Sequence, residues 1–249
     1  MADHSAMKLG RKAIHSDPRT LSIADYIAPT APAPPAACDW TNGITGWGMM
    51  MNDQISNCTV VGAAHAIQVW SANNAGVFTV RDTDIATAYQ KWGGYVLGNP
   101  ITDTGGIELQ VLNGWRQEGL GGHKLLAFAD PHYLDLTQIR HCIAIFGGVY
   151  VGFALPLTSQ FQDVWDVVPN AGPNAVKGSW GGHCVFVPKY DQNSFTCITW
   201  GALKTVTLPF WNAYCDEAHA LLGEDWLNTK GSPSHYDHDQ LLADLAAIT

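Results

Sequence analysis

Hydrophobic residues recur at intervals of three and four positions in three segments, which predicts helices over residues 56–72, 107–118 and 136–146. Ser56 or Asn57 can accept hydrogen bonds from the free amides at the start of the first helix. Asp135 with Gln138 forms a start similar to a capping box for the third helix. Glycines follow the second and third segments, as is usual where helices end.

The second half of the chain has a different pattern. Short runs of β-branched and aromatic residues predict strands at residues 149–154, 184–190, 194–200 and 203–208. Asp191-Gln192-Asn193 predicts a hairpin turn between the middle pair. Further helical segments are expected at residues 211–226 and 238–248. Helices followed by antiparallel strands indicate an α+β fold.

The beginning of the chain differs from the rest. Residues 28–35 contain too many prolines for a helix or a central strand, so this stretch is expected to be extended. We therefore expect residues 1–37 to form an extended strap on the body, or a linker. Residues 38–227 are expected to form the main domain, and residues 228–249 a helical extension.

Composition narrows the class of protein. Of 249 residues, 47% are hydrophobic and 14% charged, which is typical of a packed globule. The net charge of −9, with no basic run, argues against nucleic acid or a membrane surface as a partner. No stretch approaches the roughly 20 apolar residues of a membrane helix. Residues 1–12 are not followed by the apolar run of a secretory signal, so a cytoplasmic location is expected.

Six cysteines in a chain of this length do not indicate a disulfide framework. All but Cys58 are expected to be small buried apolar residues. A bridge between Cys184 and Cys197, across the predicted hairpin, is the one pairing left open.

Two residues are candidates for catalysis. Cys58 stands at the predicted start of a helix, where unpaired amides and the helix dipole stabilise a thiolate. His183 follows two glycines at the start of a predicted strand, and a histidine distant in sequence is the usual base for a cysteine nucleophile. His65 is expected to pack inside the helix. Residues 235–239 contain two histidines but no recognised ligand spacing, so no metal site is predicted.

Five features between residues 34 and 201 resemble the papain-like cysteine peptidases. They are Asp39-Trp40 eighteen residues before Cys58, Asn52 six residues before it, Gly105-Gly106 ahead of a helix, residues 147–152, and His183 followed by a hairpin and Thr199-Trp200-Gly201. The resemblance implies a helical lobe that carries the nucleophile on its central helix and an antiparallel β lobe that carries the histidine. It implies no metal and no organic cofactor.

Three departures bear on activity. The cysteine that the family has three residues before the nucleophile is Ile55 here. Asn52 replaces the glutamine that donates to the oxyanion, with Gln54 as the fallback donor. Ile198 stands where the family has the asparagine that orients the histidine, and isoleucine cannot accept a hydrogen bond. Thr199 can take that role if the hairpin is shifted by one residue.

The resemblance implies a thiol hydrolase that cleaves amide bonds of peptides or proteins through a Cys58–His183 dyad. In this interpretation Asn52 serves the oxyanion, Thr199 is a third member, and Gly105, Gly106 and Trp200 bind substrate. The alternative is a weak or inactive member of the fold with a structural role, for example in a phage or another particle or as a homo-oligomer. A third hypothesis is acyl or amide transfer by the same dyad.

Overall fold

A computed structural model describes residues 3–74, 76–230, 237, 239–241 and 243. Its centre is an eight-stranded sheet in which seven strands follow the order β2-β8-β3-β5-β6-β7-β4, while β1 pairs separately with β5. The strands are β1 (Cys38–Asp39), β2 (Leu125–Ala129), β3 (Val149–Leu155), β4 (Val164–Trp165), β5 (Gly181–Tyr190), β6 (Ser194–Thr199), β7 (Ala202–Thr207) and β8 (Cys215–Gly223). All pairs are antiparallel except β4 with β7.

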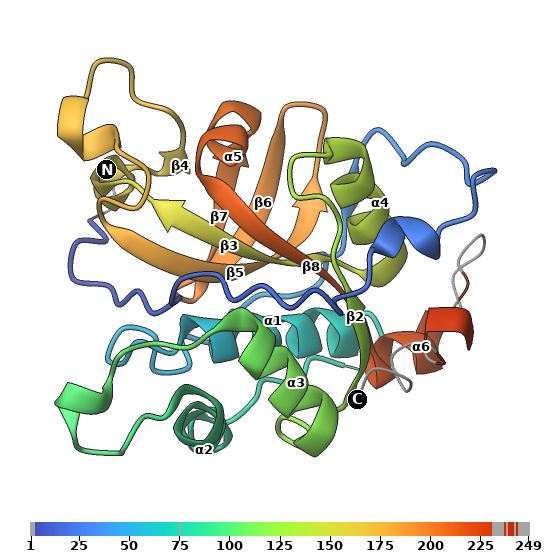
Figure 1. Cartoon of the computed structure of the whole chain (residues 1–249), viewed down its shortest axis with the longest axis horizontal. Helices are drawn as coiled ribbons and strands as arrows, with labels where there is room; N and C mark the ends of the chain where they lie inside the picture. Colours follow the sequence, from blue (N-terminus) through green and yellow to red (C-terminus); the bar gives the residue numbers. More distant parts are fainter. Residues whose placement is uncertain (1–2, 75, 231–236, 238, 242, 244–249) are drawn as a thin grey trace.

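The helices lie on both sides of this sheet (Figure 1). They are α1 (Cys58–Ala72), α2 (Asp82–Gly93), α3 (Glu108–Glu118), α4 (Leu136–Phe146), α5 (Leu208–Tyr214) and α6 (Glu224–Lys230). Short 3-10 turns occur at Ile23–Asp25, Pro100–Thr102, Leu157–Phe161 and Gly172–Ala175. Figure 1 shows α1, α2 and α3 together below the sheet, with α4 and α5 above it. The structure therefore confirms an α+β fold with a helical lobe and a β lobe.

The central helix α1 is buried along almost its whole length, because one side packs on α2 and α3 and the other on β5. Gly62 allows the close approach to the sheet, since a Cβ there would lie 3.0 Å from the Tyr150 ring and 3.3 Å from Cys184 Sγ. Two apolar clusters result, one around α1 and one on the far side of the sheet. The first turn of α1 is thereby held against the strand that carries His183.

Several predicted elements are confirmed. The helices expected over residues 56–72, 107–118 and 136–146 are α1, α3 and α4. Asp135 caps α4 by accepting hydrogen bonds from the amides of Thr137 and Gln138, and Gly147 ends it with a left-handed backbone, φ +78°. The four predicted strands are β3, β5, β6 and β7.

The prediction for residues 211–226 was wrong. A helix ends at Tyr214, the strand β8 follows, and a helix resumes at Glu224. β8 lies between β2 and β3 inside the sheet, so residues on both of its faces are buried, its polar residues Glu217 and His219 included, and no solvent-facing side marks it as a strand. Helix α2 and strand β2 were not predicted. The helix expected over residues 238–248 lies mostly outside the described residues.

All six cysteines are free, so the bridge left open between Cys184 and Cys197 does not form. Cys184 belongs to the apolar cluster around α1, whereas Cys197 belongs to the cluster on the opposite face of the sheet. Within the described part of the chain, no helix is both long and apolar enough to cross a membrane.

The first part of the chain lies on the body as an extended segment. In Figure 1 it crosses the molecule between the helices below and the sheet above. Farther along, Ile23 and Tyr26 are buried in the cluster around α1, and the Pro35 carbonyl accepts a hydrogen bond from the Tyr190 hydroxyl at 2.8 Å. We call residues 3–37 the strap.

Candidate active site

Cys58 is the first residue of α1, and its side chain is fully buried. Asn57 precedes it, and the Asn57 carbonyl accepts the amides of Val60 and Val61, which closes the first turn of the helix. The amide of Cys184 donates to Cys58 Sγ at 3.4 Å. The sulfur therefore lies against β5, at the residue directly after His183.

His183 lies in β5, and its imidazole is also fully buried. Its Nε2 forms a 2.7 Å hydrogen bond with Thr199 Oγ1, while its Nδ1 has no hydrogen-bond partner among the described residues. The Trp200 ring stacks on the imidazole with centroids 4.6 Å apart. Thr199 thus contacts the histidine, and the side chain of Ile198 packs in the cluster around α1.

Burial controls the charge of both groups. Removal from water raises the pKa of the Cys58 thiol to about 12, although hydrogen bonds from the Cys184 and Gly10 backbones oppose the shift. Burial, followed by the field of Arg11, lowers the pKa of His183 to about 3. At neutral pH the pair is therefore a thiol and a neutral imidazole. His183 Nδ1 and Cys58 Sγ are not hydrogen-bonded to each other.

The strap covers these two residues. The Gly106 amide donates to the Gly10 carbonyl at 2.7 Å, and the Lys12 amide donates to the Gly106 carbonyl at 2.9 Å. From the other side, the Gly182 carbonyl accepts the amides of Gly10 at 3.2 Å and Arg11 at 3.0 Å. The strap is therefore held as an extended chain between the helical lobe and β5, directly over Cys58.

This fit requires glycine on both sides. A Cβ on Gly10 would lie 1.9 Å from the Ser56 carbonyl oxygen, and one on Gly105 would lie 2.1 Å from the Gly10 carbonyl oxygen. A Cβ on Gly182 would lie 2.2 Å from the Arg11 carbonyl oxygen. Gly105 and Gly106, predicted to hold a substrate backbone, lie here against the strap backbone.

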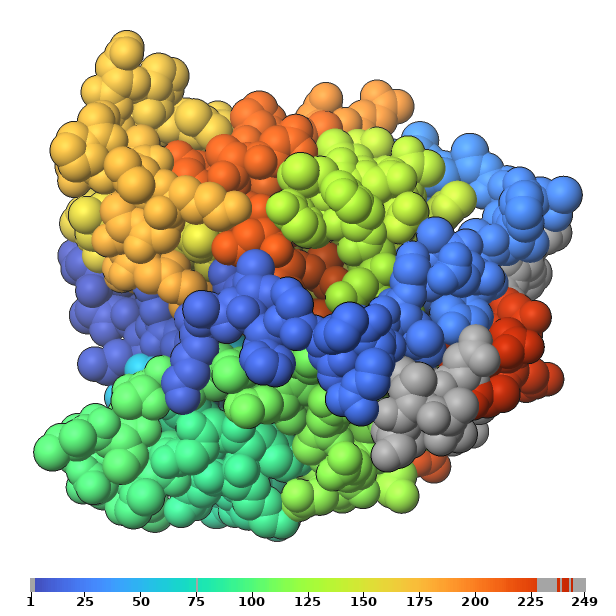
Figure 2. Space-filling view, viewed as in Figure 1, coloured from blue at the N-terminus to red at the C-terminus, as the bar shows by residue number. Residues whose placement is uncertain are grey.

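Trp200 also contacts the strap. Its indole Nε1 donates to the Lys8 carbonyl at 3.2 Å, and the His4 ring stacks on it with centroids 5.1 Å apart. The space-filling view in Figure 2 shows the strap as a continuous band between the two lobes. The predicted substrate-binding residue thus lies between the imidazole and the strap.

The predicted oxyanion donor has other partners. Asn52 Nδ2 donates to Asn57 Oδ1 at 3.1 Å and to the Ile55 carbonyl at 3.4 Å, so both of its hydrogens are engaged. Its side chain is buried, whereas Gln54 is exposed. The oxyanion role of Asn52 stays a prediction and requires that this amide change partners.

The other histidines considered from sequence have structural surroundings. His65 is buried in α1 and its Nε2 contacts the Gly48 carbonyl at 3.0 Å, as expected for a core residue. His141 Nε2 contacts the Pro32 carbonyl of the strap at 2.9 Å. Of residues 235–239, only Asp237 and Asp239 are among the described residues.

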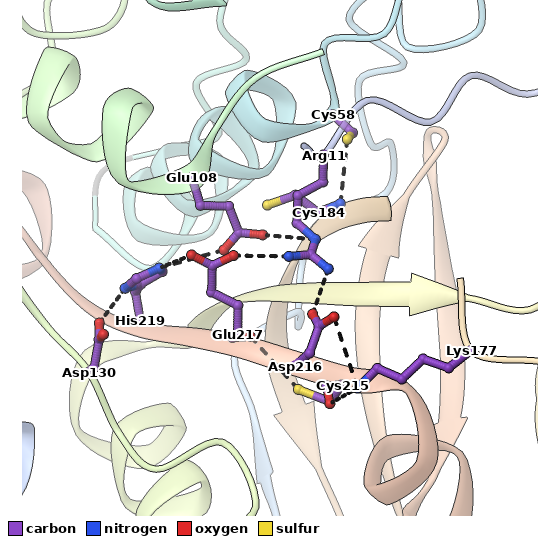
Figure 3. A network of polar contacts seen from close by, with 10 residues as sticks. All are labelled: Arg11, Cys58, Glu108, Asp130, Lys177, Cys184, Cys215, Asp216, Glu217 and His219. Atoms are coloured by element: carbon purple, nitrogen blue, oxygen red, sulfur yellow. Dashed lines mark hydrogen bonds and ion pairs between the residues drawn. The ribbon is translucent and has the colours of Figure 1, made fainter. Parts of the chain in front are cut away.

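A buried charged cluster beside Cys58 was not predicted. Figure 3 shows Glu108 of α3 together with Glu217 and His219 of β8, next to Arg11 of the strap. Glu108, Glu217 and His219 offer ligand atoms within 4.8 Å of one another, so they are a donor set for a cation. In this structure the Arg11 guanidinium lies against the two glutamates. Recognition of β8 as a strand would have placed Glu217 and His219 on one face.

Comparison with known proteins agrees with the fold. No protein-family model matches the sequence, and no curated protein matches it. Xylellain, a cysteine protease from Xylella fastidiosa, superposes with a TM-score of 0.67 over 87% of this chain and 96% of that one, at 15% identity. Digestive procathepsin L 3 of Tenebrio molitor superposes with a TM-score of 0.55 over 89% of this chain and 75% of that one, at 11% identity.

The Amb a 11 cysteine protease of ragweed pollen, in its proform, gives a TM-score of 0.54 over 82% of this chain and 70% of that one, at 13% identity. At such identities the similarity concerns the fold. Each of the three structures covers most of this chain, in which Cys58 begins the central helix. The chain therefore has the fold of the papain-like cysteine proteases.

Proposed function

We propose that this chain is a cysteine peptidase that cleaves amide bonds of peptides or proteins and is held latent by its own strap. The observation that carries the proposal is an extended peptide bound directly over Cys58. Four backbone hydrogen bonds fix it to Gly106 and Gly182. A groove that binds one extended backbone in contact with a helix-terminal thiol is suited to bind another.

Cys58 is the proposed nucleophile and His183 its base. Thr199 engages Nε2 of the imidazole, which leaves Nδ1 as the nitrogen that can take the thiol proton. The thiolate then attacks the substrate carbonyl carbon, and the C–N bond breaks as His183 returns the proton to the leaving amine. Water activated by the same nitrogen hydrolyses the thioester and restores the thiol.

The tetrahedral oxyanion needs hydrogen-bond donors. Cys58 lies at the N-terminus of α1, where its own amide and the positive end of the helix dipole favour negative charge. Asn52 is the second proposed donor, once it releases Asn57 or Ile55. Gly105 and Gly106 would hold the substrate backbone, and Trp200 would shield the imidazole from water.

Activity requires that the strap leave the groove. With the strap in place the thiol has a pKa of about 12 and the imidazole one of about 3, so neither group is in the charged state that attack requires. Exposure to water removes the main cause of both shifts. We therefore infer that strap displacement both opens the groove and activates the pair.

Hydrolysis of a fluorogenic peptide library tests the proposal. We expect little turnover by the native chain and clear turnover by the Gly10→Ala chain, in which the new Cβ clashes with Ser56. Turnover should vanish when Cys58→Ala or His183→Ala is added, and persist with Cys38→Ala or His132→Ala. No turnover by a Gly10→Ala chain whose Cys58 is accessible would favour the alternative, an inactive fold with a structural role.

A further inference from the structure

Arg11 extends its side chain from the strap into the charged cluster beside Cys58 (Figure 3). This side chain is only 4% exposed. Nη1 donates to Glu217 Oε2 at 3.0 Å, Nη2 donates to Asp216 Oδ1 at 2.5 Å, and Nε lies 3.7 Å from Glu108 Oε1. The guanidinium thus faces a separate carboxylate with each of its three nitrogens.

The pocket itself belongs to the body and not to the strap. Glu108 comes from the first turn of α3, and Asp216 and Glu217 come from β8. Gly152 of β3 leaves the necessary space, because a Cβ there would lie 2.6 Å from Glu108 Oε1 and 2.8 Å from Arg11 Cδ. The body therefore presents a shaped acidic pocket, and the strap supplies its occupant.

The pocket brings together acidic groups that a cation stabilises. Glu108 is fully buried, and neither oxygen of its carboxylate receives a hydrogen bond from a nitrogen or hydroxyl donor of the described residues. Burial and the neighbouring Glu217 raise the pKa of Glu108 to about 8. His219 Nε2 lies 3.3 Å from Glu217 Oε1 and 3.7 Å from Glu108 Oε2, and Lys177 Nζ lies 3.9 Å from Asp216 Oδ2. Despite burial, the carboxylates around His219 raise its pKa well above the ordinary value, so it shares the charge balance: Arg11 is the larger favourable charge for Glu108, and His219 the larger one for Glu217.

The same residue also takes part in the backbone pairing of the groove. Arg11 forms a bridge with Gly106 and donates its amide to the Gly182 carbonyl. Any extended chain that replaced the strap along Gly106 would present a side chain at this point. That side chain would meet three carboxylates arranged for a planar, forked cation, which is the geometry that arginine matches and lysine does not.

We propose that Glu108, Asp216 and Glu217 form a side-chain subsite that selects arginine in the substrate, and that Arg11 occupies this subsite as an internal competitor. The inference rests on the proposed peptidase function and names its substrate class, namely peptides with an arginine near the cleaved bond. The strap is then retained by the same recognition that selects the substrate, so an arginine-containing substrate competes directly with it.

Binding to the pocket can be tested without catalysis. Arg11→Ala removes the atoms of ethylguanidinium, and a cavity of about 210 Å³ lined by Asp216, Glu217 and His219 adjoins the pocket. We expect ethylguanidine to raise the Tm of the Arg11→Ala chain by several degrees, increasing with concentration. Ethylamine should have a much smaller effect, and so should ethylguanidine on the native chain and on Lys12→Ala.

Adding Glu217→Gln to Arg11→Ala should abolish most of the ethylguanidine effect. If Arg11→Ala is unfolded by itself, the same titration is followed as refolding. Equal responses of the Arg11→Ala and native chains, or equal effects of ethylguanidine and ethylamine, would overturn the proposal whether or not the protein is a peptidase.

Substrate selectivity provides a second test of the arginine subsite. With the Gly10→Ala chain, peptides that carry arginine within three residues of the reporter group should be cleaved with a kcat/KM at least tenfold above that of their citrulline counterparts. Citrulline has the same shape without the charge, so Glu217→Gln should reduce this ratio toward one. Cleavage with equal rates for arginine and citrulline would refute the subsite alone. Absence of any cleavage would refute the peptidase and leave the ethylguanidine result to decide the pocket.

Discussion

Substitution of Gly10 by alanine is the simplest test of the proposal that the strap blocks the groove over Cys58. The new Cβ would lie 1.9 Å from the Ser56 carbonyl oxygen and 2.4 Å from its carbon. Side-chain rotation cannot relieve this contact, because both groups are attached to the backbone. Ser56 is itself fixed, since Asp103 accepts its amide at 2.9 Å and its hydroxyl at 3.3 Å. The strap must therefore move out of the groove.

The hydrogen bonds that break when the strap moves set the expected size of the effect. Four backbone hydrogen bonds join the strap to Gly106 and Gly182, and each contributes about 1 kcal/mol net. Breaking most of them in advance lowers the free energy of strap opening by about 3 kcal/mol. This corresponds to about a 100-fold increase in the population with an accessible Cys58.

Iodoacetamide labelling followed by peptide mapping measures that population. When reclosing is fast, the labelling rate follows the open fraction, so Cys58 should label about 100-fold faster in Gly10→Ala than in the native chain. Gly46→Ala is the matched control, because nothing lies within 4 Å of its new Cβ. Cys142, Cys197 and Cys215 should stay protected in both variants, which separates strap opening from global unfolding. Equal labelling rates of Cys58 in Gly10→Ala and Gly46→Ala would refute the proposal that the strap blocks the groove.

Three further predictions concern the site. In the Gly10→Ala chain, Thr199→Val should lower kcat about tenfold with little change in KM, since His183 loses its hydrogen bond to the threonine hydroxyl, whereas Thr199→Ser should retain the rate; an unchanged kcat in the valine variant would contradict a positioning role. Burial lowers the pKa of His183 from 6.5 to about 3, so the unfolded chain takes up this proton first as pH falls. Relative to His183→Gln, the native chain should therefore lose about 1.4 kcal/mol of unfolding free energy per pH unit between about pH 6 and pH 4, and parallel urea-unfolding profiles would show the contrary. Gly152→Ala should lower the free energy of unfolding by about 1–3 kcal/mol, because its Cβ overlaps Glu108 and Arg11. A urea-unfolding midpoint equal to that of Gly46→Ala would argue against this close packing around Gly152.

Local signals predicted much of the fold. Helical spacing located α1, α3 and α4 to within two residues, and local signals helped at some of their ends: Asp135 caps α4, and Gly119 and Gly147 follow α3 and α4. The Asn57 side chain, in contrast, makes no capping hydrogen bond at the start of α1. Strand β8 was missed altogether. Its alanines and leucines are common in helices, and only its burial on both faces between β2 and β3 makes it a strand.

The candidate site, like the fold, was predicted from the sequence only in part. The sequence pointed to Cys58 and His183 through short motifs, and to Thr199 through the shift of one residue along β6. It did not point to the cluster of Arg11, Glu108 and Glu217, because these residues come from the strap, α3 and β8 and meet only in the folded chain. Glu108 directly follows the Gly105-Gly106 turn and Ile107, and that proximity to the groove was the one local signal available.

The central claim is that Cys58, activated by His183, attacks an amide carbonyl once the strap is out of the groove. Its most direct test is intact-mass and peptide-mapping spectrometry of the Gly10→Ala chain quenched during turnover of an arginine-containing peptide ester. The account predicts a thioester adduct on Cys58 that is absent when His183→Ala is added. An adduct on another cysteine, or no adduct on a Cys58 that iodoacetamide readily labels, would contradict it.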